Sequence, residues 1–413
     1  MYKYLGATVF IVLLGGTLFL FLTTENIINL ALLGETLNVI LPNIDPNADI
    51  EPQKPLANPP ETIKAIYVTN WSAGSEKKMK YLIDLVKNTE LNAMVIDIKD
   101  YSGYVGYETD IDLVKKYNAE EKRILKPNAL IKKLHDEGIY VIGRISIFQD
   151  LQLAKARPDL ALTSSSTGKT WGDYKGLTWM DPASQEVRDY NILIAKDALE
   201  RGFDELNFDY IRFASDGNLN DIKYPFWDEK TLKTRVIQEF FKYLRQELAD
   251  AKLSADLFGL VTINADGLGI GQHLEYALPY FDAIAPMVYP SHYFKGFNGY
   301  QNPAEFPYEV VKYSLDRAIE RITNYELGIM NKATTTTATS SIIHDSNFII
   351  PVAKLRPWLQ DFDLGADYDA AKVRAQIQAA YDAASNTPKF LDGWMLWNAS
   401  NVYTKEALIT NYE

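Results

Sequence analysis

The chain of 413 residues contains no cysteine. This absence excludes a disulfide framework, a thiolate nucleophile and any metal site built on cysteine, but it leaves the compartment open because secreted proteins need not carry disulfides. Histidine is scarce as well: the four residues are His135, His273, His292 and His344, and they form no HExxH or other two-histidine motif. A zinc hydrolase or zinc-dependent sugar deacetylase is therefore disfavoured, and we expect neither a metal nor another cofactor.

Positive charge is also in short supply. Lys and Arg number 42 against 54 Asp and Glu, which gives a net charge of −12 and argues against a nucleic-acid partner. The sequence NWSAG at residues 70–74, after the first expected strand, is not a GxGxxG fingerprint, and no GxSxG nucleophile elbow occurs. Aromatic residues are plentiful at 12%, which suits either a sugar-binding cleft or simply a large core.

The first residues predict a membrane segment. Tyr4 to Leu22 is uncharged and mostly apolar, follows Lys3, and just reaches the roughly 20 residues that cross a bilayer. No clear small-x-small cleavage site follows it, so we expect an anchor helix within residues 1–24 in preference to a cleaved signal peptide. Lys3 before the run and Glu25 after it favour a cytoplasmic N-terminus, with the rest of the chain outside the cytoplasm. If the segment is cleaved, the protein is secreted.

Residues 25–60 are expected to form a linker. The part from residue 42 is rich in proline, which predicts an extended, semi-rigid spacer that holds the following domain away from the membrane.

From residue 61 to the C-terminus, short β-branched and aromatic runs alternate with amphipathic stretches, the βαβα pattern of a parallel sheet covered by helices. The eight expected strands are Ile63–Asn70, Ala93–Lys99, Tyr140–Phe148, Glu205–Phe213, Leu253–Leu260, Ala283–Tyr289, Ile349–Arg356 and Gly393–Asn398. Eight such units predict an α/β fold of the (β/α)8 TIM-barrel type. Residues 331–347, with a run of threonines, read as a flexible insertion.

A TIM barrel builds its active site at the carboxyl ends of its strands, and residues two apart on a strand share a face. On the second strand this rule turns Asp97 and Lys99 inward, and on the fourth it turns Asp209 inward, with Arg212 just over the rim. A single buried Asp–Arg pair can be purely structural. Burying several carboxylates and arginines together costs several kcal/mol per unpaired charge, which favours a functional site.

A carboxylate-rich mouth without metal ligands points to glycoside hydrolysis, in which two carboxyl groups flank the scissile bond. Asp209 is the expected nucleophile, kept ionised by Arg144 or Arg212. Asp256 on the neighbouring strand is the expected proton donor, with a pKa raised by nearby aromatic rings. Neighbouring strands lie about 4.8 Å apart, which suits a retaining mechanism. Other aspartates compete as donor, and Asp97 in that role would imply inversion.

The remaining residues expected at the site would bind substrate. They are Asp97, Lys99, Asp100, Arg144, Arg212, Tyr289, His292, Arg356, Trp358, Asp361, Trp397 and Asn398.

Several segments together carry a resemblance to a known family. They are VIDIKD (95–100), WMDP (179–182), FDYIRF (208–213), SADLFG (254–259), PMVYPSHY (286–293), RPWLQDF (356–362) and WNASN (397–401). In this order they resemble the bacterial "putative glycosyl hydrolase domain" family, TIM barrels distantly related to the alpha-amylase type. The resemblance implies a nucleophilic Asp at the end of the fourth strand, here Asp209. Alpha-amylase-like enzymes use Glu on the fifth strand, and this chain has Asp256 instead.

The function we expect is a membrane-tethered, extracytoplasmic glycoside hydrolase acting on a polysaccharide. The alternatives are a catalytically silent barrel that binds glycan or an envelope partner, and a lyase or transglycosylase that shares the site. Two carboxyl groups about 5–10 Å apart facing an open cleft would favour hydrolysis. A site sealed by arginines would not.

Overall fold

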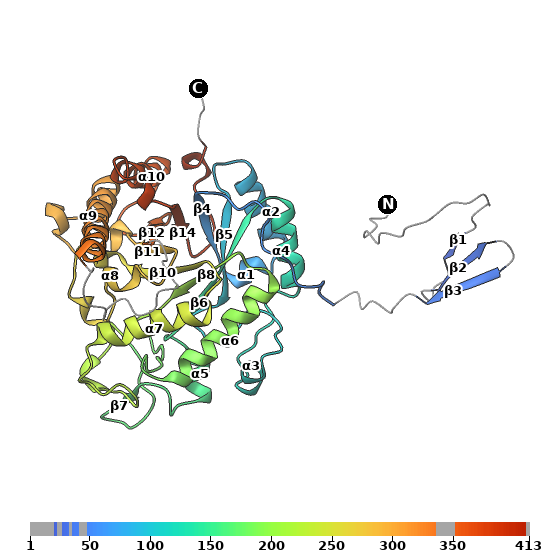
Figure 1. Ribbon diagram of the computed structural model, residues 1–413, viewed down its shortest axis with the longest axis horizontal. Helices are drawn as coiled ribbons and strands as arrows, with labels where there is room; N and C mark the ends of the chain where they lie inside the picture. The colour runs from blue at the N-terminus through green and yellow to red at the C-terminus, as the bar shows by residue number, and fades with distance from the viewer. Residues whose placement is uncertain (1–19, 23–26, 33–34, 41–47, 336–351, 410–413) are drawn as a thin grey trace. The chain divides into compact units, whose positions relative to one another are not determined.

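The computed structural model describes residues 20–22, 27–32, 35–40, 48–335 and 352–409, which belong to two compact units, residues 1–49 and 50–413 (Figure 1). In the first unit, β1 (Leu20–Leu22), β2 (Ile27–Leu32) and β3 (Glu35–Ile40) form an antiparallel sheet. β1 holds the last three residues of the expected anchor, and β2 and β3 lie in the expected linker. Residues 4–19 of the anchor lie outside the described residues, so the anchor stays a prediction. No helix in the described part of the chain has the length and apolar character needed to cross a membrane.

The second unit is a closed parallel barrel, as predicted (Figure 1). Its strands are β4 (Ile63–Val68), β5 (Ala93–Lys99), β6 (Tyr140–Ser146), β8 (Glu205–Asp209), β10 (Leu253–Phe258), β11 (Ala283–Met287), β12 (Lys354–Leu355), β13 (Trp358–Gln360) and β14 (Gly393–Trp397). The order is β10-β8-β6-β5-β4-β14-β13-β11, and pairing of β10 with β11 closes the ring. β12 and β13 together occupy the seventh position, which ends at Gln360 rather than at the predicted Arg356. The break between them contains Pro357, which has no N–H for the ladder.

Helices form a layer outside the strands (Figure 1). They are α1 (Asn70–Ala73), α2 (Glu76–Lys87), α3 (Asp112–Lys116), α4 (Pro127–Asp136), α5 (Leu151–Ala156), α6 (Gln185–Arg201), α7 (Lys233–Glu247), α8 (Leu274–Ala277), α9 (Pro307–Thr335) and α10 (Ala370–Ala383). A two-stranded ribbon joins β7 (Thr163–Ser164) to β9 (Ile222–Lys223). Of the expected insertion at 331–347, residues up to Thr335 continue α9, and the rest lies outside the described residues.

Alternation along the strands divides the core. On β4, Ala65 and Tyr67 belong to the cluster inside the barrel, whereas Ile66 and Val68 pack outward against the helices. The inner cluster also contains Trp358, which is fully buried. Because the interior is filled by side chains, any space for a ligand lies at the ends of the barrel.

The Pro-rich segment before the barrel is hydrogen-bonded to it. Residues 50–60 form no helix or strand, but the backbone N of Gln53 donates to Arg201 O at 3.0 Å and that of Leu56 donates to Asp204 Oδ1 at 2.6 Å. The compact unit therefore begins at Ile50, upstream of residue 61.

Candidate active site

A cavity of about 350 Å³ opens at the carboxyl ends of the strands. Its lining residues come from the ends of five strands and the loops that follow them: Arg144, Asp209, Tyr210, Phe258, Gly259, Leu260, Met287, Tyr289, His292, Tyr293 and Trp397. The position is the one at which TIM-barrel enzymes carry their chemistry.

Asp209 is the last residue of β8, and its side chain is 8% exposed. The backbone N of Tyr210 donates to Asp209 Oδ1 at 2.5 Å, and Arg144 Nη2 donates to Oδ2. Tyr210 has a positive φ of 53°, a left-handed conformation that turns the chain sharply after the strand. The carboxylate is therefore held at the cavity wall by two donors.

Arg144, on β6, joins three carboxyl groups. Besides Asp209 it binds Asp97 Oδ1 through Nη1 at 2.6 Å, and its Nε lies 3.5 Å from Asp256 Oδ2. Its guanidinium carbon lies 5.0 Å from the ring centroid of Trp397, which stacks on Tyr67 at 3.8 Å. One cation thus faces three acidic groups in a buried setting.

Burial raises the pKa of two of these carboxyl groups, those of Asp97 and Asp256. The pKa of Asp97 is raised, chiefly by burial. The pKa of Asp256 is raised to about 8, first by burial and then by the negative charge of Asp209, so Asp256 carries a proton at pH 7. Its Oδ1 accepts hydrogen bonds from Trp358 Nε1 at 2.7 Å and Asn207 Nδ2 at 2.9 Å. Asp256 is only 1% exposed and does not line the cavity, so it lies behind the wall that Asp209 forms.

Two further predicted residues line the cavity from the loop after β11. Tyr289 is buried, and its pKa is raised by burial. Burial lowers the pKa of His292, so the imidazole is neutral at pH 7, and its Nδ1 lies 3.0 Å from Ser291 Oγ. The ring of His292 packs edge-on against Tyr289 at 5.2 Å.

Arg212 lies next to the cavity wall. Its guanidinium carbon is 4.6 Å from the ring centroids of both Trp179 and Phe258, and Phe258 lines the cavity. Burial lowers the pKa of Arg212 to about 10. The residue keeps Phe258 in place but does not itself line the cavity.

Two predicted site residues lie elsewhere. The pairing of β5 with β6 shifts register between Asp97 and Lys99, and Lys99 Nζ instead binds Asp150 Oδ2 and Asn191 Oδ1, each at 2.7 Å, in the layer between strands and helices. The prediction that Lys99 points into the barrel is therefore wrong. Arg356 lies at the amino-terminal end of the barrel, because the seventh strand continues past it to Gln360.

Three more predicted residues remain outside the cavity, each engaged in local structure. Asp100 binds Arg123 Nη1 at 2.5 Å in the loop after β5. Asp361 accepts from Thr404 N at 2.9 Å and Thr404 Oγ1 at 2.7 Å, and Asn398 donates to the backbone O of Asp361. These contacts connect the loops after β13 and β14.

Tyr67 was not among the predicted site residues, although its hydroxyl donates to Asp97 Oδ2. Alternation in residues 63–68 would have placed it on the inward face with Ala65. Tyr210 and Tyr293 line the cavity but were not predicted as site residues, because they lie in loops without a repeating pattern.

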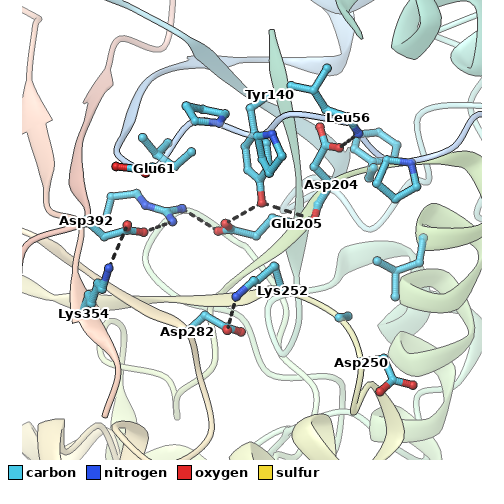
Figure 2. A pocket seen from close by; sticks show the side chains of 18 of the residues that line it. Leu56, Glu61, Tyr140, Asp204, Glu205, Asp250, Lys252, Asp282, Lys354 and Asp392 are labelled. Atoms are coloured by element: carbon cyan, nitrogen blue, oxygen red, sulfur yellow. Dashed lines mark hydrogen bonds and ion pairs between the residues drawn. The ribbon is translucent and has the colours of Figure 1, made fainter. Parts of the chain in front are cut away.

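A larger cavity, about 770 Å³, lies at the opposite end of the barrel (Figure 2). Here Arg356 Nη1 binds Glu205 Oε1 at 2.7 Å, and Arg356 Nη2 binds Asp392 Oδ2. Residues at this end of a TIM barrel usually contribute to stability and not to catalysis. In the described part of the chain, no three His, Asp or Glu residues are grouped so as to hold a metal ion.

The fold and the acidic mouth define a TIM barrel of the glycoside-hydrolase type. Residues 65–403 match the family described as "putative glycosyl hydrolase domain", and the chain belongs to that family. No curated protein matches the chain.

One of two similar solved structures agrees with the fold over most of its length. The glycoside hydrolase domain of PgaB (BpsB) from Bordetella bronchiseptica is 13% identical, with 85% of this chain and 100% of that one covered and a TM-score of 0.53. A hypothetical protein from Ruminiclostridium thermocellum is 40% identical over 46% of this chain and 96% of its own, with a TM-score of 0.43.

Proposed function

We propose that the protein hydrolyses O-glycosidic bonds of a polysaccharide, with Asp209 as the nucleophile. The observation that carries this proposal is the position of Asp209, at the end of β8 and in the wall of the mouth cavity, with its carboxylate held by Arg144 and by the backbone N of Tyr210. Both donors hold the carboxyl group of Asp209 in one position at the cavity wall, as a nucleophile requires.

The proposed mechanism is retaining. The Asp209 carboxylate attacks the anomeric carbon, the glycosidic C–O bond breaks, and the leaving oxygen takes a proton from a donor; water then hydrolyses the glycosyl-enzyme ester. Asp256 is the proposed donor, because it is protonated at pH 7 and shares Arg144 with Asp209. Since it is buried, substrate must displace part of the wall to reach it. His292 and Tyr289 already line the cavity and are the competing donors.

A second candidate is a barrel that binds glycan without cleaving it. The ion pair between Arg144 and Asp209 favours this alternative, because an arginine already occupies one of the two carboxylate oxygens.

The test compares the wild type with Asp209→Asn on a panel of polysaccharides, scored by new reducing ends. We expect the variant to lose about 10⁴-fold in rate, the range seen when a central catalytic group is removed. Asp84→Asn, on the exposed face of α2, is the matched control and should retain full activity. Equal release by wild type and Asp209→Asn removes Asp209 from the mechanism. Binding without release by the wild type supports the second candidate.

We further propose that the barrel is tethered to a membrane and faces away from the cytoplasm. The support is the uncharged run from Tyr4 to Leu22 with Lys3 before it. Fractionation of cells that express the full chain, beside a chain without residues 1–24, checks it. Membrane association of both chains, or protease resistance of the barrel in intact spheroplasts, contradicts it.

A further inference from the structure

A groove of about 680 Å³ lies beside the barrel mouth, lined by Trp71, Ser72, Ser75, Lys77, Lys78 and Tyr81, with Val402 at its edge. We propose that this groove is a second carbohydrate-binding site, which holds an acidic, uronate-containing stretch of a polysaccharide chain outside the catalytic cavity. The identification of the ligand as carbohydrate rests on the proposed function.

Trp71 gives the groove an exposed and rigid aromatic surface. Trp71 is 61% exposed, although burial of a large aromatic residue normally stabilises a protein. Arg123 packs against the ring, with its guanidinium carbon 4.7 Å from the ring centroid. Arg123 is itself held by Asp100 Oδ2 at 2.5 Å and Asn70 Oδ1 at 3.0 Å. A flat aromatic face presented in this way suits stacking against the apolar face of a sugar ring.

The charge of the groove selects an acidic ligand. Among the residues that line it, the charged ones are Lys77 and Lys78, and neither makes an ion pair with a described residue. Lys78 Nζ lies 5.6 Å from the ring centroid of Tyr81, so charge and aromatic surface adjoin. In a chain with a net charge of −12, a groove without an acidic lining residue is complementary to an anionic ligand.

The groove shares its scaffold with the catalytic cavity. α1, which carries Trp71, begins two residues after β4 ends, and Val402 follows β14. Asn401 connects the two: its Nδ2 donates to Tyr67 O at 2.9 Å, and its Oδ1 accepts from Thr69 N at 3.0 Å. Tyr67 stacks on Trp397, which lines the cavity. The groove and the cavity are therefore built on the ends of the same two strands, β4 and β14.

The experiment measures binding in the full chain with Asp209→Asn, so that cleavage does not interfere. Isothermal titration calorimetry compares an oligogalacturonate hexamer with cellohexaose, a neutral hexamer. We expect Trp71→Ala to weaken oligogalacturonate binding about tenfold through lost stacking. Lys77→Glu should weaken oligogalacturonate binding to a similar degree and leave cellohexaose unaffected, and added salt should reduce the difference between the two ligands.

Matched variants control for surface changes elsewhere. Leu193→Ala removes an apolar side chain that is 41% exposed on α6, and Lys242→Glu reverses an exposed lysine on α7. Both should bind like the parent. Unchanged affinity in Trp71→Ala, or no oligogalacturonate binding up to millimolar concentration, overturns the proposal. Equal loss in Lys77→Glu and Lys242→Glu overturns the assigned charge selectivity.

Failure of this proposal is distinguishable from failure of the hydrolase. Binding that depends on Trp71 in a wild type that releases no reducing ends keeps the groove and removes the enzyme. Hydrolysis that depends on Asp209, with no effect of Trp71→Ala on binding, supports the hydrolase and contradicts the second binding site.

Discussion

The two ends of the barrel each bury an arginine among carboxyl groups, but with different charge balance. At the amino-terminal end, Arg356 meets Glu205 and Asp392, and Lys354 lies 3.9 Å from Asp392. Two cations therefore face two carboxylates, and the set is neutral (Figure 2). Arg356 is hydrogen-bonded to both carboxylates, as a buried arginine in a structural network requires, and Lys354 is about half exposed.

At the mouth, the single guanidinium of Arg144 faces Asp97, Asp209 and Asp256. If all three were ionised the cluster would carry two excess negative charges. Burial is the main cause of the raised pKa of Asp97, and burial followed by the charge of Asp209 raises the pKa of Asp256. Carboxyl groups with raised pKa values next to a cavity are typical of functional sites. This difference supports a structural role for the amino-terminal end of the barrel and the proposed catalysis at the mouth.

The largest expected effect on stability is at the amino-terminal end. Glu205→Gln keeps the shape of the side chain but removes the charge that Arg356 Nη1 and Ser254 Oγ bind, at 2.7 and 2.5 Å. Because this leaves a buried arginine with one partner fewer, we expect the free energy of unfolding to fall by about 3–5 kcal/mol, measured by chemical denaturation.

Activity per folded molecule should be unchanged in Glu205→Gln, since the mouth is at the other end. A variant as stable as the wild type, or one that is folded but inactive, would break the distinction between the two ends.

Titration of Asp256 makes the free energy of unfolding depend on pH, and we expect this effect to be of intermediate size. Its folded pKa of about 8 lies above that of an unfolded carboxyl group, so the folded state holds a proton that the unfolded state has released between about pH 4 and pH 8. Stability from this group is present at low pH and is lost as the pH rises, by about 1.4 kcal/mol per pH unit. Asp256→Asn cannot titrate, so denaturation curves at pH 5, 6 and 7 should show a shallower fall than the wild type.

Kinetics of the same variant sharpen the assignment of the proton donor. If Asp256 donates the proton, Asp256→Asn loses activity on substrates with poor leaving groups and keeps it on activated aryl glycosides. If His292→Gln shows that pattern instead, the donor is the histidine in the cavity wall. Parallel pH curves of Asp256→Asn and wild type would show that the carboxyl group does not hold its proton as argued.

Much of this arrangement follows from the sequence. The apolar runs predicted all eight strand positions, and alternation placed Asp97 and Asp209 inside the barrel. Trp397 and Tyr289 were placed at the mouth because they end or follow strands. These predictions rest on a period of two that the closed sheet enforces, since the inner and outer faces differ in polarity.

The errors occurred where backbone irregularity overrides that period. Lys99 follows a register shift on β5, so its side chain turns to the helix layer and meets Asp150. Arg356 stands in the break between β12 and β13 and not at the end of the seventh strand, so its side chain binds Glu205 and Asp392 at the amino-terminal end of the barrel. Asp361 accepts a hydrogen bond from Thr404 in the loop after β14, a tertiary contact that no local pattern encodes.

The smallest expected effect tests the charge excess at the mouth most directly. Asp209→Asn removes one of three carboxyl groups that share Arg144, while Asp97 still binds the guanidinium at 2.6 Å. Because repulsion at the cluster falls and one cation keeps a partner, we expect stability at pH 7 to rise by about 1 kcal/mol, even as activity is lost. Glu205→Gln is the reference, since the same chemical change there should destabilise. A fall in stability for Asp209→Asn as large as for Glu205→Gln would mean that the Arg144 cluster is a structural network like the one around Arg356, and the case for chemistry at the mouth would weaken accordingly.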